Sequence, residues 1–222
     1  MEKKRLLFTG IVFMLISFIT VKAQQTNHRC STSLDLNSAY IFRGTRFGTG
    51  PAAQPSVKFN NGVFTAGVWG SFDAAGYAEA DPYLSVSFPF GLSLGLTDYY
   101  YPGLDLFDIS EVSGSHAFEI NSGFTKAGFS ISGNCIINKS EGAASAGGDL
   151  YFQAGYAISN VNFFAGAGNG WHTSDGEFNF CNIGIGTTKE IPVTDKFSIP
   201  LSGQIIINPE REQLYVVAGI SF

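Results

Sequence analysis

The stretch QLYVVAGISF, residues 213–222, shows the pattern that decides the fold. Every second position is apolar, at Leu214, Val216, Ala218, Ile220 and Phe222. Successive side chains of a β-strand point to opposite faces, so a period of two predicts a strand with one fully apolar face. Chain ends usually fray. We therefore expect this strand to be held by neighbouring strands on both sides.

The stretch LDLNSAYIFRG (Leu34–Gly44) alternates in the same way and predicts a strand over residues 33–43. One expected face is apolar and holds Leu34, Leu36, Tyr40 and Phe42. The other face is largely polar and holds Asp35, Asn37 and Arg43. In a soluble sheet the polar face would meet water, whereas in a membrane barrel it would line the lumen. This stretch alone does not separate the two.

Alternating segments recur along the whole chain, and helical periodicity is absent from them. We predict twelve strands, over residues 33–43, 53–60, 63–72, 77–88, 91–101, 116–125, 127–138, 149–158, 160–172, 178–188, 196–208 and 212–222. Short turns such as Asn60–Gly62, and a somewhat longer one at Lys189–Asp195, alternate with long loops at 44–52, 102–115 and 139–148. Short turns at one end and long loops at the other are typical of an outer-membrane barrel. The predicted fold is all-β, an antiparallel transmembrane β-barrel of about twelve strands, with ten or fourteen as alternatives.

The first 23 residues have a different character. Three basic residues, Lys3, Lys4 and Arg5, precede the apolar run Leu6–Val21, and Ala23 supplies a small residue for cleavage. This pattern predicts a secretory signal peptide over 1–23, removed after about Ala23. The remaining residues, 24–222, form one expected domain in the outer membrane of a Gram-negative bacterium.

Composition agrees with a surface that faces lipid. Charged residues make up 14% of the chain, against about 25% in an average soluble domain. The formal net charge is −5. The loss of the basic signal segment would make the chain still more acidic, which argues against a nucleic-acid partner.

A charged Arg or Lys on the lipid face would cost about 2–4 kcal/mol at mid-membrane. The polar strand faces are therefore expected to point inward, and the predicted lumen-lining residues are Asp35, Asn37, Arg43, Lys58, Glu79, Asp81 and Glu119. Arg43 would either form a constriction that grips a carboxylate or make a structural ion pair with Glu79 or Asp81. We favour the ion pair, because narrow barrels fill their interior with side chains.

Four motifs resemble those of one known family. Residues 38–44, SAYIFRG, resemble the S-x-Y-x-F-R-G stretch of the TorF-type family, also known as the Gcw_chp family. Residues 62–71 resemble its G-F-Y-A-G-x-W-x-S hairpin, residues 79–83 its E-x-D-x-Y strand, and residues 99–103 its Y-Y-P-G motif. The resemblance covers about residues 33–103, in the family order. It implies a secreted, porin-type outer-membrane barrel and little about mechanism.

No catalytic, cofactor or metal motif is recognised. His28, His116 and His172 lack metal-ligand spacing, so we predict no enzyme activity, cofactor or metal site. The run His172–Asp175 is faintly similar to the His-x-Ser-Asn motif of barrel lipid A deacylases, which leaves a lipid hydrolase as a minor alternative. Cys135 and Cys181 are expected on the outer face about 14 Å apart. This is too far for a disulfide, which spans roughly 4.4–6.8 Å between Cα atoms.

The sequence therefore predicts a narrow porin-like channel for small solutes or ions. Acidic loop residues would raise the local cation concentration, and they are Asp105, Asp108, Glu111, Asp175 and Glu177. The alternative is a non-conducting structural or adhesin barrel that binds a partner through its loops, and a plugged lumen would favour it. The expected partners are outer-membrane lipid, the barrel-assembly machinery through Phe222, and small solutes.

Overall fold

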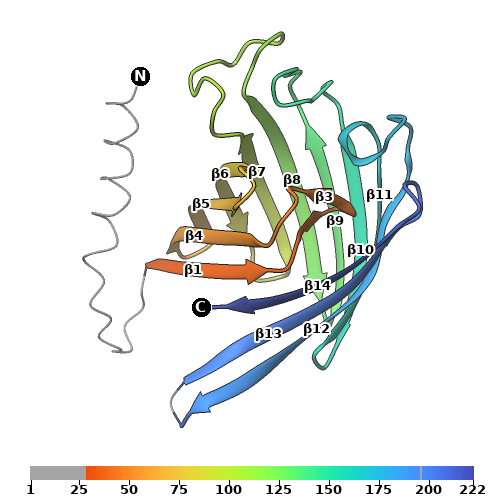
Figure 1. The fold of residues 1–222 in the computed structure, drawn as a ribbon. Helices are drawn as coiled ribbons and strands as arrows, with labels where there is room; N and C mark the ends of the chain where they lie inside the picture. Colours follow the sequence, from red (N-terminus) through yellow and green to blue (C-terminus); the bar gives the residue numbers. More distant parts are fainter. Residues whose placement is uncertain (1–28, 196) are drawn as a thin grey trace.

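The computed structural model describes residues 29–195 and 197–222, so the predicted signal peptide lies outside the described residues. Twelve antiparallel strands form a closed barrel (Figure 1). Its strands are β1 (Cys30–Asn37), β4 (Ala52–Asn61), β5 (Phe64–Asp73), β6 (Ala78–Ser87), β7 (Leu92–Tyr100), β8 (His116–Lys126), β9 (Phe129–Ile136), β10 (Leu150–Ile158), β11 (Val161–Gly168), β12 (Asn179–Thr194), β13 (Phe197–Asn208) and β14 (Gln213–Ser221). The predicted all-β barrel of twelve strands is confirmed. Among the described residues, no helix has the length and apolar character of a membrane span.

The barrel closes between its first and last strands. Asp35 pairs with Ser221, Leu36 with Ile220 and Asn37 with Gly219. The amide of Phe222 donates to the carbonyl of Leu34 at 3.0 Å, and the reverse bond measures 3.1 Å. The alternating C-terminal stretch therefore has a partner strand on each side, β1 and β13.

Large apolar side chains form an exposed band on the outside of the barrel. The band includes Val57, Val68, Leu84, Leu94, Ile120, Ile131, Phe152, Phe163, Ile183, Ile205, Leu214 and Val216. Val216 is 72% exposed. Burying such a side chain stabilises a soluble fold by about 1.5–3 kcal/mol. A contiguous band left outside is a surface suited to lipid.

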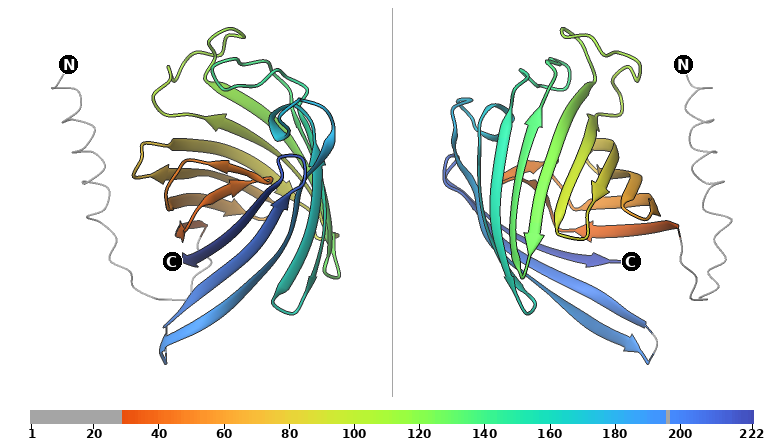
Figure 2. Two further views of the ribbon diagram at one scale, coloured as in Figure 1. Left: turned by 45° about the vertical axis from the view of Figure 1, so that its right-hand side comes forward. Right: turned by 180° about the vertical axis from the view of Figure 1, so that it is seen from behind.

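The connections differ between the two ends of the barrel, as predicted. Long loops over 101–115, 137–149 and 169–178 gather at one end, and tight turns join the strands at the other (Figure 2). The turn predicted at Lys189–Asp195 is wrong, because β12 continues to Thr194. Residues 189–194 pair with β13, and the β12–β13 hairpin extends past its neighbours (Figure 1).

The strand predicted over 33–43 is wrong beyond Asn37, and this error matters most. β1 ends at Asn37, and a separate two-stranded hairpin follows, made of β2 (Tyr40–Phe42) and β3 (Thr45–Phe47). Arg43 and Gly44 both have positive φ, 50° and 81°, the combination that a tight two-residue hairpin turn requires. The chain leaves the barrel wall after Asn37, and the β2–β3 hairpin folds inward (Figure 2).

Candidate functional site

The β2–β3 hairpin reaches across the interior of the barrel. In the closed strand order β9 lies halfway round from β1, where the hairpin starts. The tip residue Arg43 contacts Glu119 on β8 and Tyr151 on β10, the two strands that flank β9. The hairpin therefore crosses the lumen and contacts the opposite wall.

Gly44 holds the other side of the tip against the wall. A Cβ atom there would lie 1.8 Å from the carbonyl oxygen of Cys181, so only glycine fits. The side chain of Asn208 donates to the Gly44 carbonyl at 2.9 Å. Cys181, predicted on the outer face, is buried where β12 shifts its register against β11. The bulge places this residue beside the hairpin.

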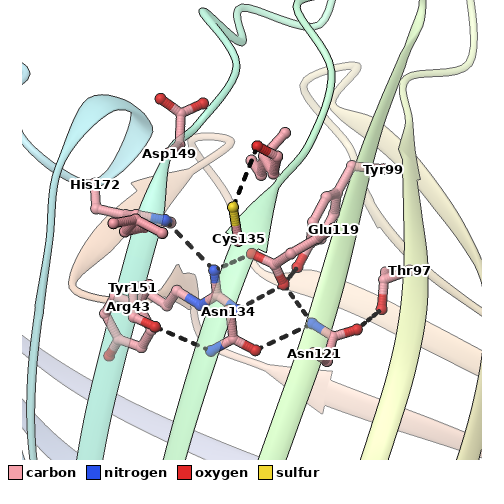
Figure 3. Close-up of polar contacts among 12 residues, drawn as sticks. Arg43, Thr97, Tyr99, Glu119, Asn121, Asn134, Cys135, Asp149, Tyr151 and His172 are labelled. Atoms are coloured by element: carbon pink, nitrogen blue, oxygen red, sulfur yellow. Dashed lines mark hydrogen bonds and ion pairs between the residues drawn. The ribbon is translucent and has the colours of Figure 1, made fainter.

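Arg43 forms a buried bidentate ion pair with Glu119. Nη1 donates to Oε1 at 2.5 Å and Nη2 to Oε2 at 2.8 Å (Figure 3). Glu119 is fully buried, and it also accepts from the hydroxyl of Tyr99 at 2.9 Å and the amide of Asn121 at 2.5 Å. The guanidinium lies 4.5 Å from the ring centre of Tyr151. Charge and hydrogen-bonding capacity are thus satisfied inside the barrel, as a buried charge requires. We call these five residues the Arg43 network.

The ion pair predicted between Arg43 and Glu79 or Asp81 is wrong, because the tip of the hairpin carries Arg43 to β8. Glu79 and Asp81 lie buried on β6, and the hydroxyl of Tyr77 donates to Glu79 at 2.7 Å. Within the described ranges, no basic side chain forms an ion pair with either carboxyl group, and Oδ1 of Asp81 has no hydrogen-bond partner.

The remaining predicted lumen residues lie on β1 and β4. Asn37 donates to Gln54 at 2.7 Å, and Gln54 donates to Ser71 on β5 at 3.3 Å, so these side chains share the inner face. Asp35 lies on the same face of β1 as Asn37, and Lys58 on the same face of β4 as Gln54, two or four positions away.

His172 covers the Arg43 network from the loop end. It ends a short 3₁₀ turn, η1 (Gly170–His172), and its Nε2 lies 3.5 Å from Nη1 of Arg43. Burial, followed by the nearby guanidinium, lowers the pKa of His172 to about 3, so the ring is neutral at physiological pH. A lipid hydrolase of the deacylase type, the minor alternative, would need a His and a Ser that face the lipid. Here His172 faces inward and the Ser174 hydroxyl bonds to Glu210.

A second histidine, His116, pairs with an acid. Its Nδ1 lies 2.9 Å from Asp98 and its Nε2 lies 2.8 Å from the carbonyl oxygen of Leu106. Each ring nitrogen already has a hydrogen-bond partner, so among the described residues His116 makes no hydrogen bond to a serine hydroxyl. The described residues also hold no cluster of three or more His, Cys, Asp or Glu that could bind a metal. The three cysteines are free thiols.

A polar hollow of about 430 Å³ lies on the turn side of the Arg43 network. Hydroxyl and amide side chains dominate its lining, with Ser85, Ser87, Ser93, Thr97, Asn121, Thr125, Ser130, Ser132, Asn134 and Gln153.

Sequence reasoning identified Arg43 and Glu119 separately but missed Tyr99, Tyr151 and His172. The Arg43–Gly44 dipeptide was the one local signal of a turn, and it is weaker than Asn-Gly or Asp-Gly.

Comparison with known proteins adds little. No protein-family model matches the chain, and no curated protein is found to be similar. Among solved structures, a triple mutant of a porin from Rh. blastica is similar at 12% identity and a TM-score of 0.40, over 77% of this chain. The match spans 55% of that porin. The relation to the TorF-type family therefore remains a prediction.

Proposed function

We propose that the protein is an outer-membrane channel for small solutes or ions, with a pore constricted by the β2–β3 hairpin. One observation carries the proposal: a barrel with an apolar outer band encloses a polar hollow of about 430 Å³. Hydroxyl and amide groups that line a hollow can replace water around a hydrated solute. The Arg43 network lies directly against this hollow, because Asn121 belongs to both.

The charges favour cations over anions. Glu119 neutralises Arg43, so the one acid of the Arg43 network balances its one base. The outer loops add further acids, and hydrogen bonds from Ser110 and Ser113 lower the pKa of Asp108, which keeps it anionic. Negative potential along a narrow path raises the local concentration of cations.

Single-channel recording of the refolded protein in a planar bilayer, across a salt gradient, tests this proposal. We expect small discrete steps and a reversal potential on the cation side. Arg43→Ala should shift that potential, whereas Arg46→Ala, a change on the same hairpin outside the network, should not. A folded, heat-modifiable barrel that never conducts would refute the channel.

The hairpin across the lumen is the observation that favours the alternative, a non-conducting barrel that acts through its loops. Asn37 and Ala52 are paired neighbours on β1 and β4, so a two-residue Asn-Gly turn can replace residues 38–51. If the intact protein is silent and this shortened barrel conducts, the hairpin is a plug and the alternative holds for the intact chain. If both conduct, with larger steps after shortening, the hairpin is the constriction of an open pore.

A further inference from the structure

A second hollow lies at the loop end of the barrel, and its character is opposite to that of the polar hollow. It measures about 340 Å³ and is lined by Phe47, Tyr77, Tyr101, Gly142, Ala143, Ala144 and Trp171. These residues come from β3, η1 and three separate loops. We call this hollow the mouth pocket. It exists only because the inserted hairpin brings Phe47 to the loops.

The aromatic walls of the mouth pocket are held in place by other contacts. The indole N–H of Trp171 donates to the carbonyl of Ala144 at 2.6 Å, and its ring packs edge-on against Tyr99 at 5.4 Å. The hydroxyl of Tyr77 donates to Glu79. The ring of Phe47 packs against Tyr77 at 5.9 Å. A pocket whose walls are already fixed loses little conformational entropy when a ligand enters.

We propose that the mouth pocket binds a small uncharged molecule with a flat aromatic body. Its volume lies in the range of small-molecule sites, about 300–1,000 Å³. No charged side chain of the described residues lines it, which disfavours an ion. The indole N–H of Trp171 and the hydroxyl of Tyr77 are already bonded to protein acceptors, so these side chains offer ring carbon to a ligand.

Ring faces and edges at fixed positions suit an aromatic ligand, which can stack against one wall and meet another edge-on. Among the described contacts, the hydroxyl of Tyr101 has no hydrogen-bond partner, so it is available for one polar group of the ligand. This inference does not depend on conduction, because the pocket lies on the loop side of the Arg43 network.

The two tryptophans of the chain, Trp69 and Trp171, allow a direct test. In a Trp69→Phe background, Trp171 is the sole donor for energy transfer to N-phenyl-1-naphthylamine, an uncharged aromatic probe. We expect saturable transfer in the folded, detergent-solubilised protein. Each aromatic wall should contribute about threefold to tenfold in affinity. The double variant Phe47→Ala, Tyr101→Ala should therefore bind at least about tenfold more weakly.

The matched control is Phe90→Ala, which removes an exposed ring at the turn end and should leave the affinity unchanged. Heat-modifiable gel mobility shows whether each variant folds. If the double variant fails to fold, competition in the parent protein still decides the question, because naphthalene must displace the bound probe with a saturable curve. Transfer that rises linearly with probe and is insensitive to naphthalene reflects partition into detergent and overturns the proposal.

Discussion

Removal of the Arg43 guanidinium should destabilise the barrel strongly, because it leaves the fully buried carboxylate of Glu119 without its cation. Breaking a buried ion pair from one side costs about 3–5 kcal/mol. Tyr99 and Asn121 still donate to Glu119 in the variant, which reduces the cost. We therefore expect Arg43→Ala to lower the free energy of unfolding by about 2–4 kcal/mol.

The assay is reversible urea unfolding in detergent, followed by tryptophan fluorescence. Lys139→Ala is the matched control, because Lys139 pairs with Glu141 at 3.0 Å but both side chains are about half exposed. An exposed pair contributes about 0–1 kcal/mol. The double variant Arg43→Ala, Glu119→Gln should regain part of the loss, since no uncompensated charge stays buried.

An Arg43→Ala cost no larger than that of Lys139→Ala would refute this reasoning. It would mean that Glu119 gains water or a proton readily, and that the hairpin is not held by the ion pair. A double variant that is less stable than Arg43→Ala alone would also contradict the argument, because it would deny the penalty of a lone buried carboxylate.

Three further predictions follow from the hairpin and its surroundings. Gly44→Ala should displace the hairpin and enlarge the single-channel step, because its Cβ would meet the Cys181 carbonyl, whereas Gly50→Ala, with open space around it, should not. The folded pKa of His172, about 3, lies below its unfolded value of about 6.5, so the stability that its neutral ring contributes is fully present above pH 6.5 and is lost as the pH falls toward 3. His172→Gln should therefore flatten the pH dependence of the unfolding free energy between about pH 3 and 6.5. Maleimide should label the exposed Cys30 in the folded barrel but the buried Cys181 only after unfolding, which peptide mapping can measure. Equal labelling of the two cysteines in the folded protein would contradict the buried position of Cys181.

The sequence by itself determined the architecture of the wall. A strand must place alternate side chains on opposite faces, so the pattern in Gln213–Phe222 and its repeats indicates which residues face outward. The lengths of the connections then indicate which strand ends lie together. Both signals are local, and the number and order of the predicted strands agree with the barrel, because neighbouring strands in the sequence are also neighbours in space. The bounds agree less well, since β1 ends at Asn37 and β12 continues to Thr194.

Only the tertiary structure decided what fills the barrel. The alternation of Leu34 and Leu36 continues through Tyr40 and Phe42, although the first pair lies on the wall and the second lies on the inserted hairpin. An apolar face packed against other rings in the lumen has the same sequence pattern as one packed against lipid. The partner of Arg43 depends on how far the hairpin reaches across a closed barrel. That distance is set by the number and tilt of all the strands together, and no local pattern contains it.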